Sequence, residues 1–374
     1  MSGRANGEGS IYKRKDGRWC ATISLDGGRR KAVYGKTREE AAHKLTKALK
    51  AQQDGRSIPG ERETVRIYLL RWLEDVARPT VRPGTYDGYE RVVRLQLNPE
   101  IGTIRLARLG AEDLARCYRR LLATGLSPRS VQLAHAVLHR ALRDAERWNL
   151  ISRNPASLVD APRPKPPERQ PLAPEQIKEL LAASEGDRLH ALYVVAVSGG
   201  LREGELLGLR WTDLDLERGS LSVQQQVQRT RAGWVFSEPK TSKGRRVVTL
   251  PRVAVEALKR HRQQQRVERV AAGAAWGDQG LVFANQVGRP IEKQNLIRRS
   301  FRPLLMRAGL PPIRFHDLRH SAATLLLHQG VHMKVVQERL GHATIAVTMD
   351  TYSHVMPSMQ KDASDRLDEF FTGT

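Results

Sequence analysis

The chain has 374 residues, of which 40% are hydrophobic and 28% charged, so it is long and apolar enough to form two or three folded domains. Lys and Arg number 63 against 40 Asp and Glu, which gives a formal net charge of +23 and a pI of about 10.6. This excess favours a polyanionic partner, because each neutralised phosphate releases condensed counterions. No basic amphipathic helix with a Trp or Leu face stands out, so nucleic acid is favoured over a membrane surface.

The two cysteines, Cys20 and Cys117, lie far apart in the sequence. They allow no disulfide framework and no metal-binding spacing, and are typical of small core residues in a reducing compartment. The first ten residues contain no apolar segment of a secretory signal. The apolar run at 191–197 is too short to cross a bilayer. We therefore expect a cytoplasmic protein.

Residues 1–57 are predicted to form a small sheet of three strands followed by one helix. Turns are indicated at Asp16-Gly17 and at 26–28, and Thr37 with Glu40 predicts a capping box at the start of the helix. A ribbon of this kind can enter the major groove of DNA; the alternative is a solvated basic surface. The candidate DNA-binding residues are Lys13, Arg14, Lys15, Arg18, Arg29, Arg30 and Lys31.

Residues 64–160 show apolar side chains at helical spacing, with Gly and Pro between the segments. This pattern predicts a bundle of four or five helices. A linker rich in Pro, Lys and Arg follows it. Residues 170–374 are predicted to be mostly helical, interrupted by a strand-like region at 219–251. The expected fold is thus a multidomain, mainly α protein with small β elements, including a small hairpin or sheet in the last domain.

In this last domain, Gly199-Gly200 precede a predicted helix with Arg202 in its first turn. The positive end of the helix macrodipole disfavours arginine there, unless an anion binds at the same place. The alternative is a surface arginine paired with Glu205. Further on, Lys240 and Lys243 lie in a predicted turn between two strands. There a lysine can be held over a site, or can simply be a solvated hairpin tip.

His316, Arg319 and His320 occupy positions i, i+3 and i+4 of a predicted helix and so share one face. Zinc is disfavoured, because no third ligand follows at a usual spacing and the arginine repels a cation. An anion-binding face fits better, although polar residues at the start of a core helix would give the same pattern. Near the end, Gly341 is predicted to terminate a helix, followed by His342 and, ten residues later, Tyr352.

Together these segments supply arginines, histidines, a lysine and a tyrosine without a set of metal ligands. Phosphoryl transfer on DNA without a metal requires these groups. Cations neutralise the transition state, a base takes the proton of the nucleophile and an acid protonates the leaving oxygen.

Residues 170–374 resemble the catalytic domain of the tyrosine recombinases of the phage integrase family. The resemblance rests on GLREGELLGLRW, HDLRH, LGH and Tyr352, which occur in the family's order and spacing. More loosely, residues 64–160 resemble the family's helical, SAM-like core-binding domain. Residues 1–57 resemble the arm-binding domain of integrases from mobile elements.

The resemblance implies that Tyr352 is the nucleophile and forms a 3′-phosphotyrosyl link. It implies that Arg202 and Arg319 clamp the phosphate, that His316 is the base or proton shuttle, and that His342 hydrogen-bonds the phosphate. Lys240 would protonate the leaving oxygen, with Lys243 as the competing candidate. Glu205 and His320 would support these residues. No metal and no cofactor is implied.

The implied partners are double-stranded attachment sites of core and arm type, three further copies of the chain in a tetramer and, where the reaction requires one, a host DNA-bending protein or excision factor. The last predicted helix, with Met359, Ala363, Leu367 and Phe370 on one stripe, would dock on a neighbouring copy rather than on its own domain. A bacterial protein that associates with the nucleoid while acting is expected.

The resemblance thus favours a site-specific DNA integrase of a mobile element, and three other functions stay open. A chromosome-dimer resolvase would use the same chemistry, but such relatives usually lack a basic N-terminal sheet domain. A type IB topoisomerase shares the nucleophile and relaxes supercoils instead. A non-catalytic DNA-binding regulator would need phosphate contacts but no nucleophile.

Overall fold

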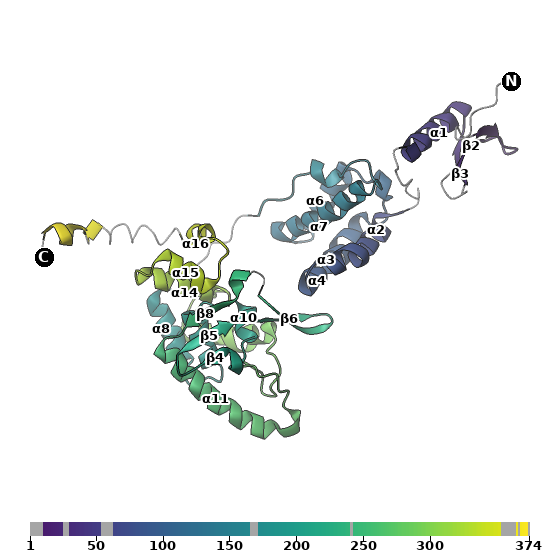
Figure 1. Cartoon of the computed structure of the whole chain (residues 1–374). Helices are drawn as coiled ribbons and strands as arrows, with labels where there is room; N and C mark the ends of the chain where they lie inside the picture. The colour runs from purple at the N-terminus through teal and green to yellow at the C-terminus, as the bar shows by residue number, and fades with distance from the viewer. Residues whose placement is uncertain are drawn as a thin grey trace. The chain divides into compact units, whose positions relative to one another are not determined.

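The computed structural model describes residues 10–24, 30–53, 63–164, 171–239, 242–352, 364–365 and 367–372. The chain forms two compact units, Met1–Pro166 and Pro167–Thr374 (Figure 1). Each unit contains a buried hydrophobic core. Among the described residues, no helix is both long and apolar enough to cross a membrane.

The first unit begins with a three-stranded antiparallel sheet and one helix, which confirms the predicted N-terminal fold. The elements are β1 (Ser10–Lys13), β2 (Trp19–Ser24), β3 (Arg30–Gly35) and α1 (Arg38–Gln53), with β2 in the middle of the sheet. Ala21, Ala41 and Leu45 form the small buried core between sheet and helix. The helix starts as predicted, since the backbone N–H of Glu40 donates to Thr37 Oγ1 at 3.1 Å.

The rest of this unit is a helical bundle. Its α-helices are α2 (Val65–Trp72), α3 (Arg78–Thr80), α4 (Pro83–Val92), α5 (Asn98–Ile101), α6 (Ala111–Ala123) and α7 (Pro128–Arg147). Tyr68 and Trp72 are fully buried in its core. The indole N–H of Trp72 donates to Asp144 Oδ2 at 2.8 Å, which ties the first helix of the bundle to the last.

Several helices in the described part of the chain contain a π-helical turn at the same place relative to a proline. The turns are Leu73–Ala77, Val93–Leu97 and Ile297–Phe301, and the prolines Pro79, Pro99 and Pro303 follow two residues later. In each case the residue before the proline donates its N–H to the carbonyl five residues back. Proline lacks an N–H and clashes with the preceding turn, so a widened turn keeps the helix continuous.

The second unit is built around α9 (His190–Gly199), whose residues 191–197 are all buried. The apolar run that is too short for a membrane is therefore a central core helix, and it packs against α11 and α14. The helices around it are α8 (Pro174–Ala183), α10 (Glu203–Leu207), α11 (Arg252–Ala272), α12 (Lys293–Leu296), α13 (Arg302–Arg307), α14 (Asp317–His328), α15 (Met333–Leu340) and α16 (Ile345–Tyr352). Short 3-10 turns lie at Leu106–Arg108 and Pro155–Leu158 in the first unit. In the second unit they lie at Trp211–Asp213, Ser242–Gly244 and Gly273–Ala275.

This unit also contains small antiparallel sheets. One is made of β4 (Leu214–Asp215), β5 (Ser220–Val223) and β8 (Arg246–Thr249), and another is a hairpin of β6 (Gln226–Thr230) and β7 (Gly233–Ser237). The prediction that a hairpin turn joins the strands around Lys240 and Lys243 is wrong. Strand β8 pairs with β5 and not with β7, so this segment connects two different sheets.

Candidate active site

The C-terminal end of α15 is the point on which the candidate residues converge. Gly341 ends this helix with a φ of 66°, which confirms its predicted role as the terminating glycine. The last carbonyls of a helix have no partner within it and carry its negative dipole end. Here three consecutive carbonyls, those of Arg339, Leu340 and Gly341, each accept a hydrogen bond from an arginine of another element.

Arg319 reaches the middle carbonyl from the first turn of α14. Its side chain is buried, with Nη2 donating to the Leu340 carbonyl at 2.6 Å and Nη1 to the Gly200 carbonyl at 2.7 Å. Gly200 ends α9 with a φ of 64°, so the guanidinium spans the ends of two helices. A Cβ on Gly200 would lie 2.8 Å from Leu340 Cδ2, which explains why the two ends can approach so closely.

Arg202 reaches the last carbonyl, with Nη2 donating to Gly341 at 3.1 Å. Its backbone is extended and immediately precedes α10, so it lies one residue before the helix rather than in its first turn as predicted. The predicted pairing with Glu205 exists but is no surface contact. The Glu205 side chain is 1% exposed, and its carboxylate accepts hydrogen bonds from Nη1 at 2.7 Å and from the backbone N–H of Arg202 at 3.0 Å.

His342 follows these carbonyls directly and lies within the field of the same arginines. Burial, together with the charges of Arg319 and Arg202, lowers the pKa of His342 to about 4. The imidazole is therefore neutral at physiological pH. Its Nδ1 lies 2.9 Å from Oγ1 of the fully buried Thr348, which stands one helical turn before Tyr352 in α16.

His316 directly precedes α14 and is exposed, and its ring meets that of His320 edge-on at a centroid distance of 5.3 Å. Desolvation lowers the pKa of His316, with Arg319 acting in the same direction. The shared helix face predicted for His316, Arg319 and His320 is thus occupied by two neighbouring rings and a buried guanidinium. Among the described residues, no group of three or more His, Cys, Asp or Glu side chains could hold a metal.

The lysines and the tyrosine are described only in part. Lys240 lies outside the described residues. Lys243 is exposed, and its Nζ donates to the Ala343 carbonyl at 2.7 Å, directly after His342. Tyr352 ends α16, and its side chain lies outside the described part of the structure. The structure therefore brings together Arg202, Glu205, His316, Arg319, His320 and His342.

Two further residues of this site were missed by sequence reasoning. Arg246 donates from Nη2 to Glu205 at 2.9 Å and from Nε to the Arg339 carbonyl at 2.6 Å, and Thr348 contacts His342. A signal for Arg246 was present in the sequence. It precedes Val248 by two residues in a strand, so alternation places it on the buried face, where a charge is unusual.

The predicted DNA-binding residues of the first unit are accounted for only in part. Lys13, Arg14, Lys15 and Arg18 are exposed. Two of them form ion pairs with Asp16, Arg18 at 2.9 Å and Arg14 at 3.7 Å. Arg29 lies outside the described residues. Arg30 and Lys31 belong to β3, with side chains outside the described part.

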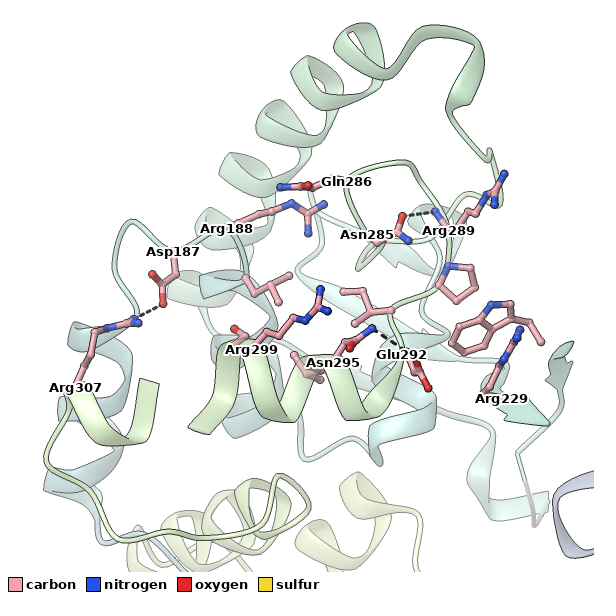
Figure 2. A pocket seen from close by; sticks show the side chains of 16 residues that line it. Asp187, Arg188, Arg229, Asn285, Gln286, Arg289, Glu292, Asn295, Arg299 and Arg307 are labelled. Carbon is pink, nitrogen blue, oxygen red and sulfur yellow. Dashed lines mark hydrogen bonds and ion pairs between the residues drawn. The ribbon is translucent and has the colours of Figure 1, made fainter. Parts of the chain in front are cut away.

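A further feature of the second unit is an open hollow of about 900 Å³. Five arginines are among the residues that line it: Arg188, Arg229, Arg289, Arg299 and Arg307. Figure 2 shows Arg299 extending from its helix into this hollow. Two of the arginines are neutralised, Arg188 by Glu268 and Arg307 by Asp187. Arg229 stacks on Trp234 at 5.3 Å. The hollow therefore keeps an excess of positive charge.

Comparison with known families matches two parts of the chain. Residues 170–359 match the model of the phage integrase family, and residues 64–122 match that of the phage integrase N-terminal SAM-like domain. The first match covers the whole site described above.

Relatives of similar length match nearly the whole chain. An integrase of Streptomyces ambofaciens is 34% identical, with 96% of each chain covered. An integrase of Saccharopolyspora erythraea is 30% identical, covering 99% of this chain and 98% of the relative. A tyrosine recombinase XerC-like protein of Caldanaerobacter subterraneus is 31% identical, with 91% and 92% covered.

Solved structures show the same fold. The integrase of transposon Tn1549 in complex with transposon right end DNA aligns with a TM-score of 0.68 at 24% identity, covering 82% of this chain and 99% of that one. A lambda integrase tetramer bound to a Holliday junction aligns with a TM-score of 0.58 at 19% identity, covering 93% and 96%.

Proposed function

Because the chain belongs to the phage integrase family of tyrosine recombinases, we propose that it integrates and excises a mobile element by cutting and rejoining double-stranded DNA at attachment sites. The observation that carries this proposal is the convergence of Arg202, Arg319 and His342 on the end of α15, with His316 beside them. Such a group of cations and neutral imidazoles suits a phosphodiester that becomes more negative during reaction.

In the proposed reaction, the hydroxyl oxygen of Tyr352 forms a bond to the scissile phosphorus while the bond from phosphorus to the 5′ oxygen breaks. The products are a 3′-phosphotyrosyl link and a free 5′-hydroxyl. The link keeps the free energy of the phosphodiester, so rejoining needs no ATP. When the attacking hydroxyl comes from a partner duplex, strands are exchanged, and two rounds pass through a Holliday junction.

Arg202 and Arg319 are proposed to bind the non-bridging oxygens of the scissile phosphate. Their guanidinium groups are already oriented by the backbone carbonyls at the ends of α9 and α15. This orientation before DNA binds reduces the reorganisation needed in the transition state. Glu205 supports Arg202, and His320 supports His316 through the ring contact.

Proton transfer is assigned to His316 and to one lysine. His316 accepts the proton of Tyr352, which its lowered pKa allows because the ring is then neutral. Lys240 gives a proton to the 5′ oxygen, with Lys243 as the alternative donor. His342 donates a hydrogen bond to the phosphate. None of these steps uses a metal ion or a cofactor.

The three domains are proposed to divide DNA binding between them. Residues 1–57 would bind arm-type sites, residues 64–160 would bind core sites, and residues 170–374 would carry the chemistry. Four copies would assemble on the paired sites, with the C-terminal helix of each docking on a neighbour. A host DNA-bending protein or an excision factor would act on the same complex.

A chromosome-dimer resolvase is the nearest alternative function, and the similarity to the XerC-like relative supports this alternative. The three-stranded N-terminal domain favours the integrase. A non-catalytic regulator would use the same basic surfaces without Tyr352.

A plasmid that carries two candidate attachment sites, taken from beside the gene, tests the proposal. We expect the purified protein, or a cell extract that contains it, to produce recombinant plasmids, and Tyr352→Phe to bind the sites without producing any. Recombinants with Tyr352→Phe would contradict the proposed chemistry. Binding by the wild type without recombinants, on any pair of sites and with host extract added, would favour the regulator.

A further inference from the structure

Three arginines bind the three consecutive carbonyls at the end of α15, and two of them are the proposed phosphate ligands Arg202 and Arg319. The third, Arg246, has no role in the reaction described above. It begins β8, directly after the segment that carries Lys240 and Lys243. Its side chain is only 7% exposed, which is unusual for an arginine.

Every nitrogen of the Arg246 guanidinium donates a hydrogen bond. Nε donates to the Arg339 carbonyl at 2.6 Å, Nη1 to the Gly244 carbonyl at 3.0 Å, and Nη2 to Glu205 Oε2 at 2.9 Å. One planar group therefore joins three elements: the end of α15, the approach to β8, and α10. Lysine, with a single ammonium, cannot reproduce this fork.

Glu205 is the link from Arg246 to the proposed phosphate ligand. The carboxylate is 1% exposed in its side chain and is shared by Arg246 and Arg202. Burial acts to raise the pKa of Glu205, but Arg246 and Arg202 outweigh it and hold the pKa below its ordinary value. Without Arg246, the carboxylate would lose one of two cationic partners in a site from which water is excluded, and its position would be less defined.

The packing around Gly341 shows how little room there is for adjustment. A Cβ on this glycine would lie 2.8 Å from the Lys243 carbonyl oxygen and 3.1 Å from Arg246 Nη1. The Gly341 carbonyl is also the acceptor for Arg202. A displacement of Arg246 would therefore move both anchors of Arg202, its carboxylate and its carbonyl.

We propose that Arg246 is a positioning residue for DNA cleavage, which fixes Arg202 against the scissile phosphate through Glu205 and the end of α15. The inference rests on the proposed function and adds a residue to it. Arg246 itself does not contact the phosphate. A purely structural ion pair would stabilise the fold and affect every step equally, whereas a positioning residue affects the step in which the phosphate gains charge.

The test compares Arg246→Met and Arg246→Lys with Arg245→Met. Arg245 is the adjacent arginine, half-exposed and paired with the exposed Glu238, so it is a matched control. Single-turnover cleavage of a nicked suicide duplex gives the rate of the chemical step. DNA binding, measured in a Tyr352→Phe background, and thermal unfolding show whether each variant is folded.

We expect Arg246→Met to cleave about 100-fold more slowly than the wild type, since displacing a reacting group by about 1 Å has an effect of this order. Arg246→Lys should keep a large part of this defect, and Arg245→Met should cleave normally. DNA binding should change by less than about threefold in all three variants.

Two modified substrates identify the route by which Arg246 acts. A methylphosphonate at the scissile position removes one anionic oxygen and so reduces the demand on Arg202. A 5′-bridging sulfur leaves as a thiolate and needs no proton donor. The Arg246→Met defect should shrink at least tenfold on the methylphosphonate and persist on the sulfur substrate.

Equal defects on all three substrates in folded, DNA-binding Arg246→Lys would overturn the proposal, because they would indicate a general structural role. A defect relieved only by the sulfur substrate would also overturn it and would place Arg246 with the lysine segment. Failure of the proposed function is distinguishable from both, since the wild type itself would then form no adduct that depends on Tyr352.

Discussion

Arg202 and Arg319 are both held by backbone carbonyls at helix ends, and Arg202 is held in addition by the buried carboxylate of Glu205. Arg319 bridges the ends of α9 and α15, and Arg202 is anchored on the next carbonyl of α15. Backbone acceptors move less than side chains, so the positive charges are fixed in place before the substrate arrives. At the residue scale, the geometry of the site is set by the acceptor atoms that bind each guanidinium group.

The hydrogen bond between Thr348 and His342 is expected to set the tautomer of the imidazole. A neutral ring that donates from Nε2 must accept at Nδ1, and the Thr348 hydroxyl is the donor within reach. We predict that Thr348→Val lowers the cleavage rate about tenfold, the equivalent of one hydrogen bond. Single-turnover cleavage measures this effect. Thr348→Ser, which keeps the hydroxyl, should cleave normally; full activity of Thr348→Val would refute the assignment.

The low pKa of His342 predicts how stability depends on pH. The folded-state pKa of about 4 lies below the ordinary 6.5, so the unfolded chain binds the proton more readily. This residue's contribution to stability is therefore complete above about pH 6.5 and is lost as pH falls towards 4. Denaturant unfolding at about pH 7 and pH 4.5 should show a smaller loss for His342→Gln than for the wild type. An equal loss in both proteins would contradict the prediction.

At the scale of elements, the end of α15 tolerates no side chain at Gly341. We predict that Gly341→Ala abolishes cleavage, because the alanine adds strain at a φ of 66° and also collides with the Lys243 carbonyl. Gly309→Ala is the matched control, since Gly309 has a φ of 64° and open space around it. It should lower the free energy of unfolding by about 1 kcal/mol and leave cleavage unchanged. Normal cleavage by Gly341→Ala would show that the end of α15 is not the frame of the site.

Elements whose signals are local were predictable from the sequence. Thr37 and Glu40 marked the start of α1, Gly341 marked the end of α15, and helical spacing marked the bundle. The pairing of β8 was not predictable, because a strand's partner is decided by distant packing. The nearest strand in sequence, β7, pairs instead with β6, and β8 pairs with β5.

The candidate site was predictable to the extent that its residues lie in short motifs. Arg202, His316, Arg319 and His342 are marked by their neighbours in sequence. Arg246 and Thr348 owe their roles to contacts made across 41 residues and across a helix end, respectively. Strand alternation places Arg246 on a buried face, but no local pattern identifies its partner Glu205 or the contact of Thr348 with His342. The π-helical turns were also missed, although each precedes a proline at the same distance.

At the scale of the whole molecule, the net charge of +23 predicts DNA binding that weakens steeply with salt. If the arginine-lined hollow of Figure 2 contacts the DNA backbone, Arg299→Gln should weaken binding equally on all sequences. It should also reduce the slope of log affinity against log salt by about 1. Arg218→Gln, at an exposed arginine paired with Asp215, is the control. An unchanged slope for Arg299→Gln would exclude this surface from the DNA interface.

The C-terminal segment is predicted to join protomers. Leu367, Phe370 and Phe371 are exposed at 55%, 80% and 76%, so they expose apolar surface suited to a partner. Removal of residues 358–374 should leave binding to a single site intact and should abolish assembly of the Holliday junction complex. Native gel electrophoresis with one site and with two paired sites separates these effects. Unchanged junction assembly by the truncated protein would contradict docking between copies.

The central claim is that Tyr352 attacks the scissile phosphate without a metal ion. The measurement that tests it most directly uses a nicked suicide duplex carrying a candidate attachment site, in EDTA, followed by denaturing electrophoresis and peptide mapping of any adduct. We predict a covalent DNA adduct on the peptide that contains Tyr352, and none with Tyr352→Phe. Tight binding of the same DNA without an adduct, or an adduct on another residue, would contradict the claim.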